Sequence, residues 1–456
     1  MILFAVGKSK VAAELLSVEG IGLIFTLSSA IGIIGTISNF GLATLATRDI
    51  SLLFKKDKNL FLKEISLYNI LSFTTGIIGL LLIIIFHRQI GFFSFGNSEY
   101  NLYIILLCVL PLLSQYNTSQ FSVLQASQNF TYLTKSNILS SFFVFISAIT
   151  LYYFLRQDGI PLVIIITAIF PVLFNTLFIK KLNYKRVKIS YSLIYERFIL
   201  LVKRGSFISL SYSLPNITIY LITIFLIKEE GLIASGLFAC AYTIMSNFNN
   251  LLVSTLNPEF LSRISNQNNV VKISEHINNQ IKLVINIISP LLILLIFSSS
   301  FLIILFYNND FILSNNVLIL LLLSAVFKSL LWVLNYIYIV MKNESFFFYI
   351  EMTLSLFIVL FVYTFYSTFD LETLGIAFLG SYFLVFLFSS LIIFIKYKIT
   401  LSLNTVINIV PQILILTVLA FLKINYFEYD FTYLFLTFFI TSGLISYFYF
   451  KKTLNY

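Results

Sequence analysis

The feature that most constrains this chain is a series of long apolar runs, separated by short segments that carry charge, Gly or Pro. A helix needs about 20 mostly apolar residues to cross a hydrocarbon core about 30 Å thick. We therefore predict about fourteen transmembrane helices. They lie near residues 1–16, 20–47, 66–86, 101–121, 138–155, 160–179, 205–227, 231–256, 278–306, 314–340, 346–367, 374–395, 404–422 and 431–450.

Composition excludes most other classes of protein. Of the 456 residues, 59% are hydrophobic and 11% are charged, whereas about 25% are charged in an ordinary soluble domain. The loops between the predicted helices are too short to hold a soluble domain. Outer-membrane barrels are excluded because their strands alternate apolar and polar residues over segments of about ten residues. The apolar runs of this chain are longer and do not alternate in this way. The chain is thus predicted to be an all-α polytopic membrane protein.

The positions of Lys and Arg predict the orientation, because cytoplasmic loops retain positive charge. Of the 29 Lys and Arg residues, 22 lie in one set of alternate segments. The opposite set holds only Arg88, Arg156, Lys228 and Lys423. We therefore expect both chain ends in the cytoplasm. The net charge of +10 indicates this topology, and no nucleic-acid partner is expected because the basic residues are spread over many short loops.

A weak internal repeat relates the two halves of the chain. A shift of 211 residues aligns Gly20 with Gly231 and Asn39 with Asn250, and eight of 33 positions match over this stretch. The repeating unit contains six predicted helices. Because six is even, two such units insert in the same orientation and are related by a pseudo-twofold axis along the membrane normal.

A second stretch, shifted by 214 residues, pairs Asn129 with Asn343. The repeat predicts how the chain is divided. The parts are an N-terminal six-helix bundle over 1–180, a cytoplasmic linker over 181–204, a C-terminal six-helix bundle over 205–395 and an extra helix pair within 396–456.

Three short stretches resemble a family of membrane transporters. They are Leu16-Ser-Val-Glu-Gly-Ile-Gly-Leu23, Gly41-Leu-Ala-Thr-Leu-Ala-Thr-Arg-Asp-Ile50 and Val123-Leu-Gln-Ala-Ser-Gln-Asn-Phe130. Together with the predicted 6+6+2 helices, they resemble the polysaccharide-repeat-unit flippases, the Wzx-type translocases of O-antigen, in the multidrug/oligosaccharidyl-lipid/polysaccharide exporter superfamily. Many relatives carry Gly where this chain has Ala126.

The resemblance implies a V-shaped pair of six-helix bundles, alternating access and an undecaprenyl-diphosphate-linked oligosaccharide as substrate, used for O-antigen or other surface polysaccharide. It implies the bacterial inner membrane as location, membrane lipids as partners, and a polysaccharide polymerase and a chain-length regulator as candidate partners. In the related lipid II flippases the extra helix pair helps to form a groove for the lipid tail, and we expect this of 404–422 and 431–450.

Charges inside the predicted helices are candidates for binding a diphosphate. A Lys at a helix centre in a membrane is unfavourable by about 2.5–3.5 kcal/mol, so such residues usually face a cavity or a partner. Lys328 lies near mid-depth and is predicted to bind substrate, although a structural pairing with a carboxylate is the alternative. Glu351 is a candidate coupling group, with hydrogen bonding to a polar neighbour as its alternative.

Near the N-terminus, Lys10 and Glu14 are four residues apart and can neutralise each other on one helix face. This leaves Lys8 as the freer cation and a second candidate for binding substrate.

Further candidates come from the helix ends and from the repeat. Arg48 and Asp49 end the second predicted helix, and the repeat aligns Arg48 with Glu259, so we predict a gate pair, with ordinary interfacial charges as the alternative. Asn39 and Asn250 are predicted to bind sugar hydroxyls, although hydrogen bonding between helices is the commoner use of Asn in a membrane. Pro215 removes a backbone donor, which predicts a hinge.

Two other function classes agree less well with the sequence. A multidrug or cation antiporter of the same superfamily would need a net acidic cavity, whereas the set of Lys8, Lys10 and Lys328 against Glu14 and Glu351 favours an anionic substrate. An enzyme would need a large outward loop, and the largest, 87–100, has about 14 residues. No catalytic motif, metal cluster or cofactor-binding loop is recognisable, so we expect a transporter without cofactor or metal.

Overall fold

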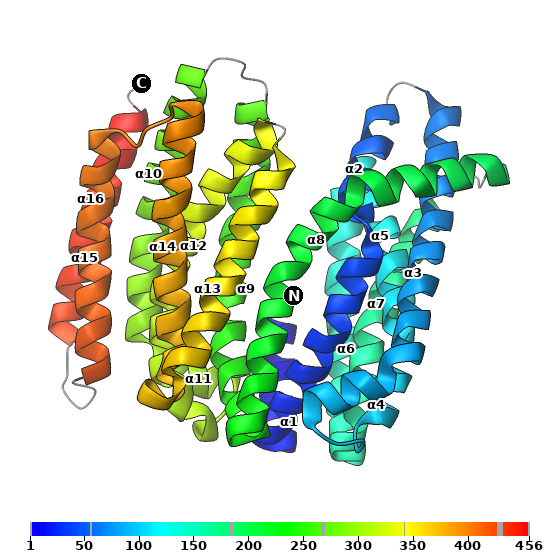
Figure 1. Cartoon of the computed structure of the whole chain (residues 1–456), viewed down its shortest axis with the longest axis horizontal. Helices are drawn as coiled ribbons and strands as arrows, with labels where there is room; N and C mark the ends of the chain where they lie inside the picture. The colour runs from blue at the N-terminus through cyan, green and yellow to red at the C-terminus, as the bar shows by residue number, and fades with distance from the viewer. Residues whose placement is uncertain are drawn as a thin grey trace. The chain divides into compact units, whose positions relative to one another are not determined.

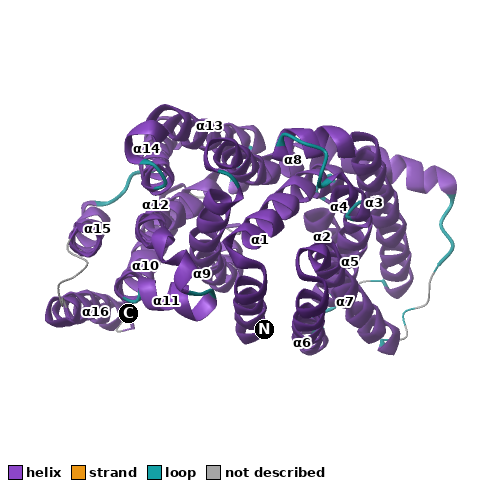
Figure 2. Ribbon diagram, turned by 90° about the horizontal axis from the view of Figure 1, so that it is seen from below, coloured by secondary structure: helices purple, strands orange, loops and turns teal. Residues whose placement is uncertain are grey.

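The computed structural model describes residues 2–54, 57–182, 184, 187–265, 270–341, 343–425 and 432–454. This part of the chain consists of helices and short loops and contains no strand (Figure 2). Ten of its helical segments are long and apolar enough to cross a membrane. The predicted class, an all-α polytopic membrane protein, is confirmed. The number of fourteen transmembrane helices stays a prediction.

The chain divides into two compact units, Met1–Gly236 (unit 1) and Leu237–Tyr456 (unit 2). Unit 1 holds α1 (Ile2–Asn39), α2 (Leu42–Leu53), α3 (Lys58–Phe95), α4 (Asn101–Leu106), α5 (Val109–Ala126), α6 (Phe130–Leu155), the 3₁₀ helix η1 (Arg156–Asp158), α7 (Gly159–Lys181) and α8 (Tyr191–Glu230), coloured blue to green in Figure 1. Unit 2 holds most of α9 (Leu232–Ser265), then α10 (Val270–Phe297), α11 (Ser299–Phe306), η2 (Asn309–Ser314), α12 (Asn315–Val340), α13 (Glu344–Phe369), α14 (Glu372–Tyr397), α15 (Leu403–Asn425) and α16 (Thr432–Leu454).

The first helix, α1, is interrupted at the junction that the sequence predicted between its first two transmembrane helices. Ser17 has φ 63° and ψ −175°, so α1 is two helices joined at a kink. The second predicted helix, 20–47, differs from the structure, because Phe40 and Gly41 both have positive φ and separate α1 from α2. A Cβ on Gly205 of α8 would overlap the carbonyl oxygen of Phe40. The turn is therefore held by close packing of α8.

A hydrophobic core of unit 1 lies where α2 packs onto α3, α5 and α8. It includes Ile50 of α2, Phe61 and Leu71 of α3, Val123 of α5 and Leu201 of α8. Because α8 takes part, the helix that begins the predicted C-terminal bundle packs with unit 1. The predicted bundle bounds follow the sequence repeat and not this packing, and they stay a prediction.

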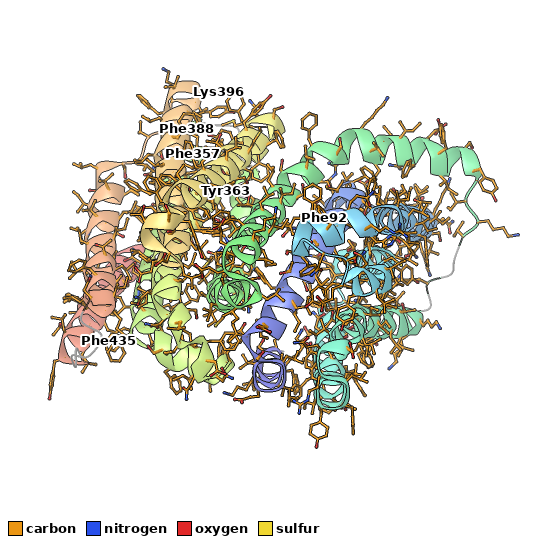
Figure 3. The ribbon with its side chains drawn as sticks, turned by 60° about the horizontal axis from the view of Figure 1, so that its bottom comes forward. Phe92, Phe357, Tyr363, Phe388, Lys396 and Phe435 are labelled. Atoms are coloured by element: carbon orange, nitrogen blue, oxygen red, sulfur yellow. The ribbon has the colours of Figure 1, made fainter. Side chains whose placement is uncertain are left out.

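In unit 2, α12 is the most deeply buried of the candidate membrane helices. Buried residues make up 83% of its apolar window, against 22% for α13. Large side chains on other helices are exposed, among them Phe92 of α3, Tyr363 of α13 and Phe388 of α14 (Figure 3). A charged side chain on α12 is therefore held among protein groups, whereas these rings are available to contact lipid.

The last two helices are joined to α10 by polar side chains. Asn286 Nδ2 of α10 donates to Asn408 Oδ1 of α15 at 2.8 Å, and Ser446 Oγ of α16 donates to the Asn286 carbonyl at 2.8 Å. Ser442 of α16 donates to Gln412 of α15 at 2.7 Å. Such bonds between helices are a common means of association in membranes. They make the predicted extra helix pair part of unit 2.

The shift of 214 residues seen in the sequence also relates local backbone geometry. Asn129 and Asn343 precede α6 and α13, which both have 26 residues. Each Asn donates its backbone N–H to the carbonyl five residues earlier. Arg156 and Asp370, at the ends of these helices, share nearly the same conformation, with φ 52° and 47° and ψ −128° and −135°. The sequence match therefore reflects a repeated structural element.

Candidate functional site

Lys328 lies midway along α12 and is partly buried. Its Nζ is 5.8 Å from the centroid of the ring of Tyr382 in α14, a distance at which an aromatic ring attracts a cation. Among the described residues, no carboxylate oxygen lies within 4.0 Å of Lys328, so the charge has no direct ion pair there.

Glu351 of α13 is held by an amide. Asn335 Nδ2 of α12 donates to Glu351 Oε1 at 2.9 Å. The other end of the same amide, Asn335 Oδ1, is buried without a hydrogen-bond partner. It can accept a bond from a cation or from a protonated carboxyl group. Unit 2 thus combines an ammonium group, a carboxylate and an open amide oxygen within one helix bundle.

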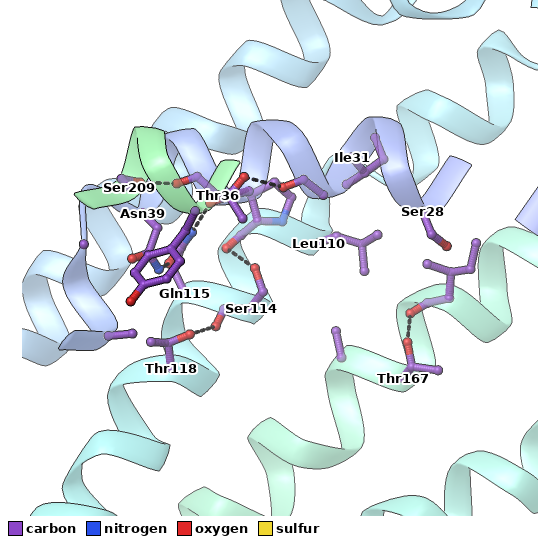
Figure 4. A pocket seen from close by; sticks show the side chains of 18 of the residues that line it. Ser28, Ile31, Thr36, Asn39, Leu110, Ser114, Gln115, Thr118, Thr167 and Ser209 are labelled. Atoms are coloured by element: carbon purple, nitrogen blue, oxygen red, sulfur yellow. Dashed lines mark hydrogen bonds between the residues drawn. The ribbon is translucent and has the colours of Figure 1, made fainter. Parts of the chain in front are cut away.

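Unit 1 contains a cavity of about 610 Å³ (Figure 4). Its walls come from α1, the start of α2, α5, α7 and α8. The polar residues that line it are Ser28, Thr36, Asn39, Thr44, Ser114, Gln115, Thr118, Thr167, Ser209 and Tyr212. This volume falls within the range of about 300–1,000 Å³ typical of sites for small molecules.

Asn39 lies in this cavity beside Gln115 (Figure 4). Asn39 Nδ2 donates to Gln115 Oε1, and Gln115 Nε2 donates to the carbonyl of Gly35 at 2.7 Å. The predicted candidate is therefore oriented by a buried amide of α5. Asn250 is exposed on α9, while its neighbour Asn249 accepts a hydrogen bond from Ser329 at 2.9 Å. The binding roles of Asn39 and Asn250 stay predictions.

The polar face of α5 was not among the predicted sites. Residues 114–120 read Ser-Gln-Tyr-Asn-Thr-Ser-Gln, a polar run inside an otherwise apolar segment. That run is the signal that would have located the cavity, because a membrane helix with six polar residues within one seven-residue stretch needs polar partners on several sides.

Near the N-terminus, the structure shows the predicted pairing of Lys10 with Glu14 and no ion pair of Lys8 with a described carboxylate. Lys10 Nζ lies 3.0 Å from Glu14 Oε1, which confirms the predicted pair. Lys8 is partly buried. No carboxylate of the described residues pairs with it. Its role in binding substrate stays a prediction.

Arg48 and Asp49 belong to a charged network in unit 1. Arg48 Nε lies 3.5 Å from Asp49 Oδ1, and Tyr68 OH donates to Asp49 Oδ2 at 2.7 Å. Arg197 of α8 reaches Asp49 of α2 at 3.9 Å and Glu64 of α3 at 3.3 Å. The Glu64 side chain is 9% exposed. Arg197 thus fastens the start of α8 to two other helices, a role that the sequence analysis did not assign.

Two predicted residues concern motion between states. Pro215 lies within α8, which Figure 1 shows as a bent helix and which continues through this residue. The side chain of Glu259 lies outside the described residues, so the predicted pair with Arg48 is not examined by the structure. The hinge and the gate both stay predictions.

Unit 2 also carries an apolar groove of about 460 Å³. It is bounded by α10, α12, α14 and the segment that leads into α15, and its lining includes Leu334, Leu391, Phe394 and Leu401. Its surface is almost wholly hydrocarbon, which suits a lipid chain. Within the described part of the chain, no group of three or more His, Cys, Asp or Glu residues is placed to hold a metal ion.

No family model matches this sequence, and no curated protein matches it. Solved structures are similar in fold. An inward-facing multidrug resistance MATE family transporter of the MOP superfamily has a TM-score of 0.68 and 16% identity, covering 88% of this chain and 96% of its own. The lipid II flippase MurJ, in an inward closed conformation, has a TM-score of 0.64 and 15% identity, covering 100% of both chains.

A further similar structure is a MOP superfamily transporter from Pyrococcus furiosus, with a TM-score of 0.60 and 15% identity over 87% of this chain and 92% of its own. The reverse polarity of its binding pocket is taken to suggest a different function for that protein. All these neighbours are transporters. The chain therefore has the fold of MOP superfamily transporters, the fold that multidrug transporters and a lipid II flippase share.

Proposed function

We propose that this protein flips undecaprenyl-diphosphate-linked oligosaccharide repeat units from the cytoplasmic to the outer leaflet, by alternating access, for O-antigen or another surface polysaccharide. The observation that carries the proposal is the extent of similarity. The lipid II flippase is matched over 100% of this chain, whereas the multidrug transporter is matched over 88%. The flippase structure therefore aligns with the whole chain, including the part that the multidrug transporter structure does not cover.

The charges inside the helices are assigned to the diphosphate. Lys328 would attract it in unit 2, and Lys8 and Arg48 would supply further positive charge in unit 1. A carrier of about two negative charges through a medium of low polarity needs such cations, because an unpaired buried charge is strongly unfavourable. Asn39 and Asn250 are assigned to sugar hydroxyls. The apolar groove of unit 2 suits the lipid chain, although its described lining ends at Leu401. The expected groove along the extra helix pair, 404–422 and 431–450, stays a separate proposal.

Coupling and gating involve the remaining candidates. Glu351 would respond to a proton or a cation, a role supported by the open oxygen of Asn335 beside it. Arg48 and Asp49 would close a cytoplasmic gate with Glu259, and Pro215 would act as a hinge in α8.

The proposal includes fourteen transmembrane helices, two pseudo-twofold bundles with an extra pair, and both termini in the cytoplasm of a bacterial inner membrane. A reporter active only in the cytoplasm should work after Tyr456 and after Lys188, and it should fail after Glu230 or Asp310. A cytoplasmic signal at Glu230 would reject this orientation. The polymerase and the chain-length regulator remain proposed partners.

Deletion of the gene in its host tests the function directly. A flippase-deficient strain should accumulate a lipid-linked glycan on the cytoplasmic leaflet and lose surface polysaccharide, and the intact gene should restore both. Loss of resistance to cationic drugs, with surface polysaccharide unchanged, would instead support the multidrug alternative. The higher TM-score of the multidrug structure favours that alternative, but the unit 1 cavity lacks acidic side chains among its described lining residues.

A further inference from the structure

We infer that the cavity of unit 1 binds uncharged sugar residues of the transported glycan and discriminates against acidic sugars. This inference rests on the proposed function and names the part of the substrate that this cavity holds. It follows from the hydrogen-bonding state of the lining, from the absence of charge among its described residues, and from the space in front of two glycines.

Hydroxyl groups in the cavity mostly donate to backbone carbonyls. Thr118 Oγ1 donates to the Ser114 carbonyl at 2.9 Å, Ser114 Oγ donates to the Pro111 carbonyl at 3.1 Å, and Thr167 Oγ1 donates to the Ile164 carbonyl at 2.6 Å. A hydroxyl that has given its proton away still has acceptor lone pairs. These oxygens therefore present acceptors to the cavity (Figure 4).

The amides continue this pattern. Asn39 uses its Nδ2 group on Gln115, and Gln115 uses its Nε2 group on Gly35. The Oδ1 atom of Asn39 is left as an acceptor, since an amide oxygen carries two lone pairs. A ligand that fits must supply donors, and a sugar ring supplies a hydroxyl proton at most of its carbons.

Charge narrows the ligand class. The described residues that line the cavity include no Lys, Arg, Asp, Glu or His. An acidic sugar would place a carboxylate against acceptor oxygens without a cation, and a cationic drug would have no carboxylate to pair with. Either charge would be held without compensation, which is unfavourable in surroundings of low polarity. Aliphatic residues such as Ile31, Leu110 and Ile164 complete the lining and suit the C–H faces of sugar rings.

Two glycines of α1 provide a direct way to fill the cavity. Gly32 and Gly35 both line it, and a Cβ built on either meets no atom within 4 Å. Larger side chains can therefore enter the space without displacing neighbours. A helical Gly loses more backbone entropy on folding than other residues do. Replacing it reduces this loss, so Gly32→Leu should fold. Gly443 of α16 is the matched control, because a Cβ there also meets nothing within 4 Å and it does not line this cavity.

The experiment measures binding to the purified full chain in lipid nanodiscs with three probes. They are undecaprenyl diphosphate without sugar, the same carrier with a neutral trisaccharide of hexose and N-acetylhexosamine, and the same carrier with hexuronic acid in place of hexose. The neutral probe should bind about tenfold more tightly than the other two, the gain that one or two net hydrogen bonds produce. Gly32→Leu should abolish this gain without weakening the sugar-free probe, and Gly443→Leu should retain it.

Thr44→Lys gives an independent test if Gly32→Leu does not fold. Thr44 is an exposed lining residue, and a cation there should shift the preference toward the hexuronic acid probe. Equal binding of the neutral and sugar-free probes by the wild type would overturn the inference while leaving the proposed flippase function intact. Preference for the acidic probe in the wild type would also overturn it. Failure of all three probes to bind would reject the proposed function as well.

Discussion

The two units share a helical framework and differ in the polar groups that they hold. In unit 1 the cavity presents hydroxyl and amide groups, while Arg48, Asp49, Glu64 and Arg197 form a charged network between α2, α3 and α8. In unit 2 the ionisable groups Lys328 and Glu351 lie within the helix bundle. The two units therefore differ in where ionisable side chains lie relative to the sites described above: outside the cavity lining in unit 1, and within the site itself in unit 2.

Repeated positions make the same point. Arg156 and Asp370 end equivalent helices with nearly the same backbone angles, although their charges are opposite. Asn39 lines a cavity, whereas Asn250 is exposed. The repeat therefore relates where these helices begin and end, whereas the side chains at repeated positions lie in different surroundings in each unit.

The largest expected effect concerns the charge of unit 2. Lys328→Ala should accumulate and unfold like the wild type, because it removes an unfavourable buried charge, but transport should fall about tenfold to a hundredfold, as loss of one charge-assisted hydrogen bond predicts. Lys328→Arg should retain part of the activity, because the charge survives while its shape changes. The measurement is restoration of surface polysaccharide in a flippase-null strain, with expression checked by immunoblot. Wild-type polysaccharide from the Ala variant would make Lys328 a structural residue.

The charged network of unit 1 should show the opposite behaviour. Arg197→Leu leaves the buried Glu64 carboxylate without its cation and should lower the free energy of unfolding by about 3 kcal/mol. Transport per folded molecule should fall less than in Lys328→Ala, because Arg197 reaches the proposed gate residue Asp49 only at 3.9 Å. Thermal unfolding in detergent provides the measurement. The double variant Arg197→Leu with Glu64→Leu should recover much of the loss, and additive losses would show that the two side chains are independent.

A smaller effect distinguishes the paired asparagines. Asn39→Ala removes a bond to Gln115 and an acceptor in the cavity, so transport should fall about fivefold, the equivalent of one net hydrogen bond. Asn250→Ala should have a weaker effect, because its side chain is exposed on α9. Rates from an in vitro flipping assay compare the two variants at equal protein content. Equal losses of transport would mean that the two aligned asparagines have the same role, whether or not they line the cavity.

The smallest effect is expected at the first helix. Glu14→Gln breaks the Lys10–Glu14 pair, whose side chains are 37% and 52% exposed, and should change the free energy of unfolding by about 0.5 kcal/mol or less. Lys8→Gln should leave stability unchanged and lower transport. Unfolding curves and transport rates of both variants test this, and a transport defect in Glu14→Gln alone would reverse the assignment of the two lysines.

Much of the helical framework could be predicted because it depends on local sequence. Long apolar runs require helices in a membrane, and charged or Gly-containing segments mark their ends, so the kink at Ser17 and the start of α13 were anticipated, whereas α6 begins eight residues before the predicted start at 138. The break at Phe40 and Gly41 was not, because it depends on Gly205, a residue 164 positions away along the chain. The Lys10–Glu14 pair was predictable since both residues lie on one helix face.

The site depended on tertiary packing to a greater degree. Lys328 and Glu351 were recognisable from sequence as candidates, because a charge within an apolar run is rare and unfavourable without a partner or a cavity. The cavity of unit 1 combines residues of α1, α5, α7 and α8, and the role of Arg197 arises from α8 meeting α2 and α3. Sequence by itself determined the membrane class, most of the helical segments and the repeat, since these follow from hydropathy and short-range geometry. Only the tertiary structure decided which polar groups meet, because that depends on how distant helices pack.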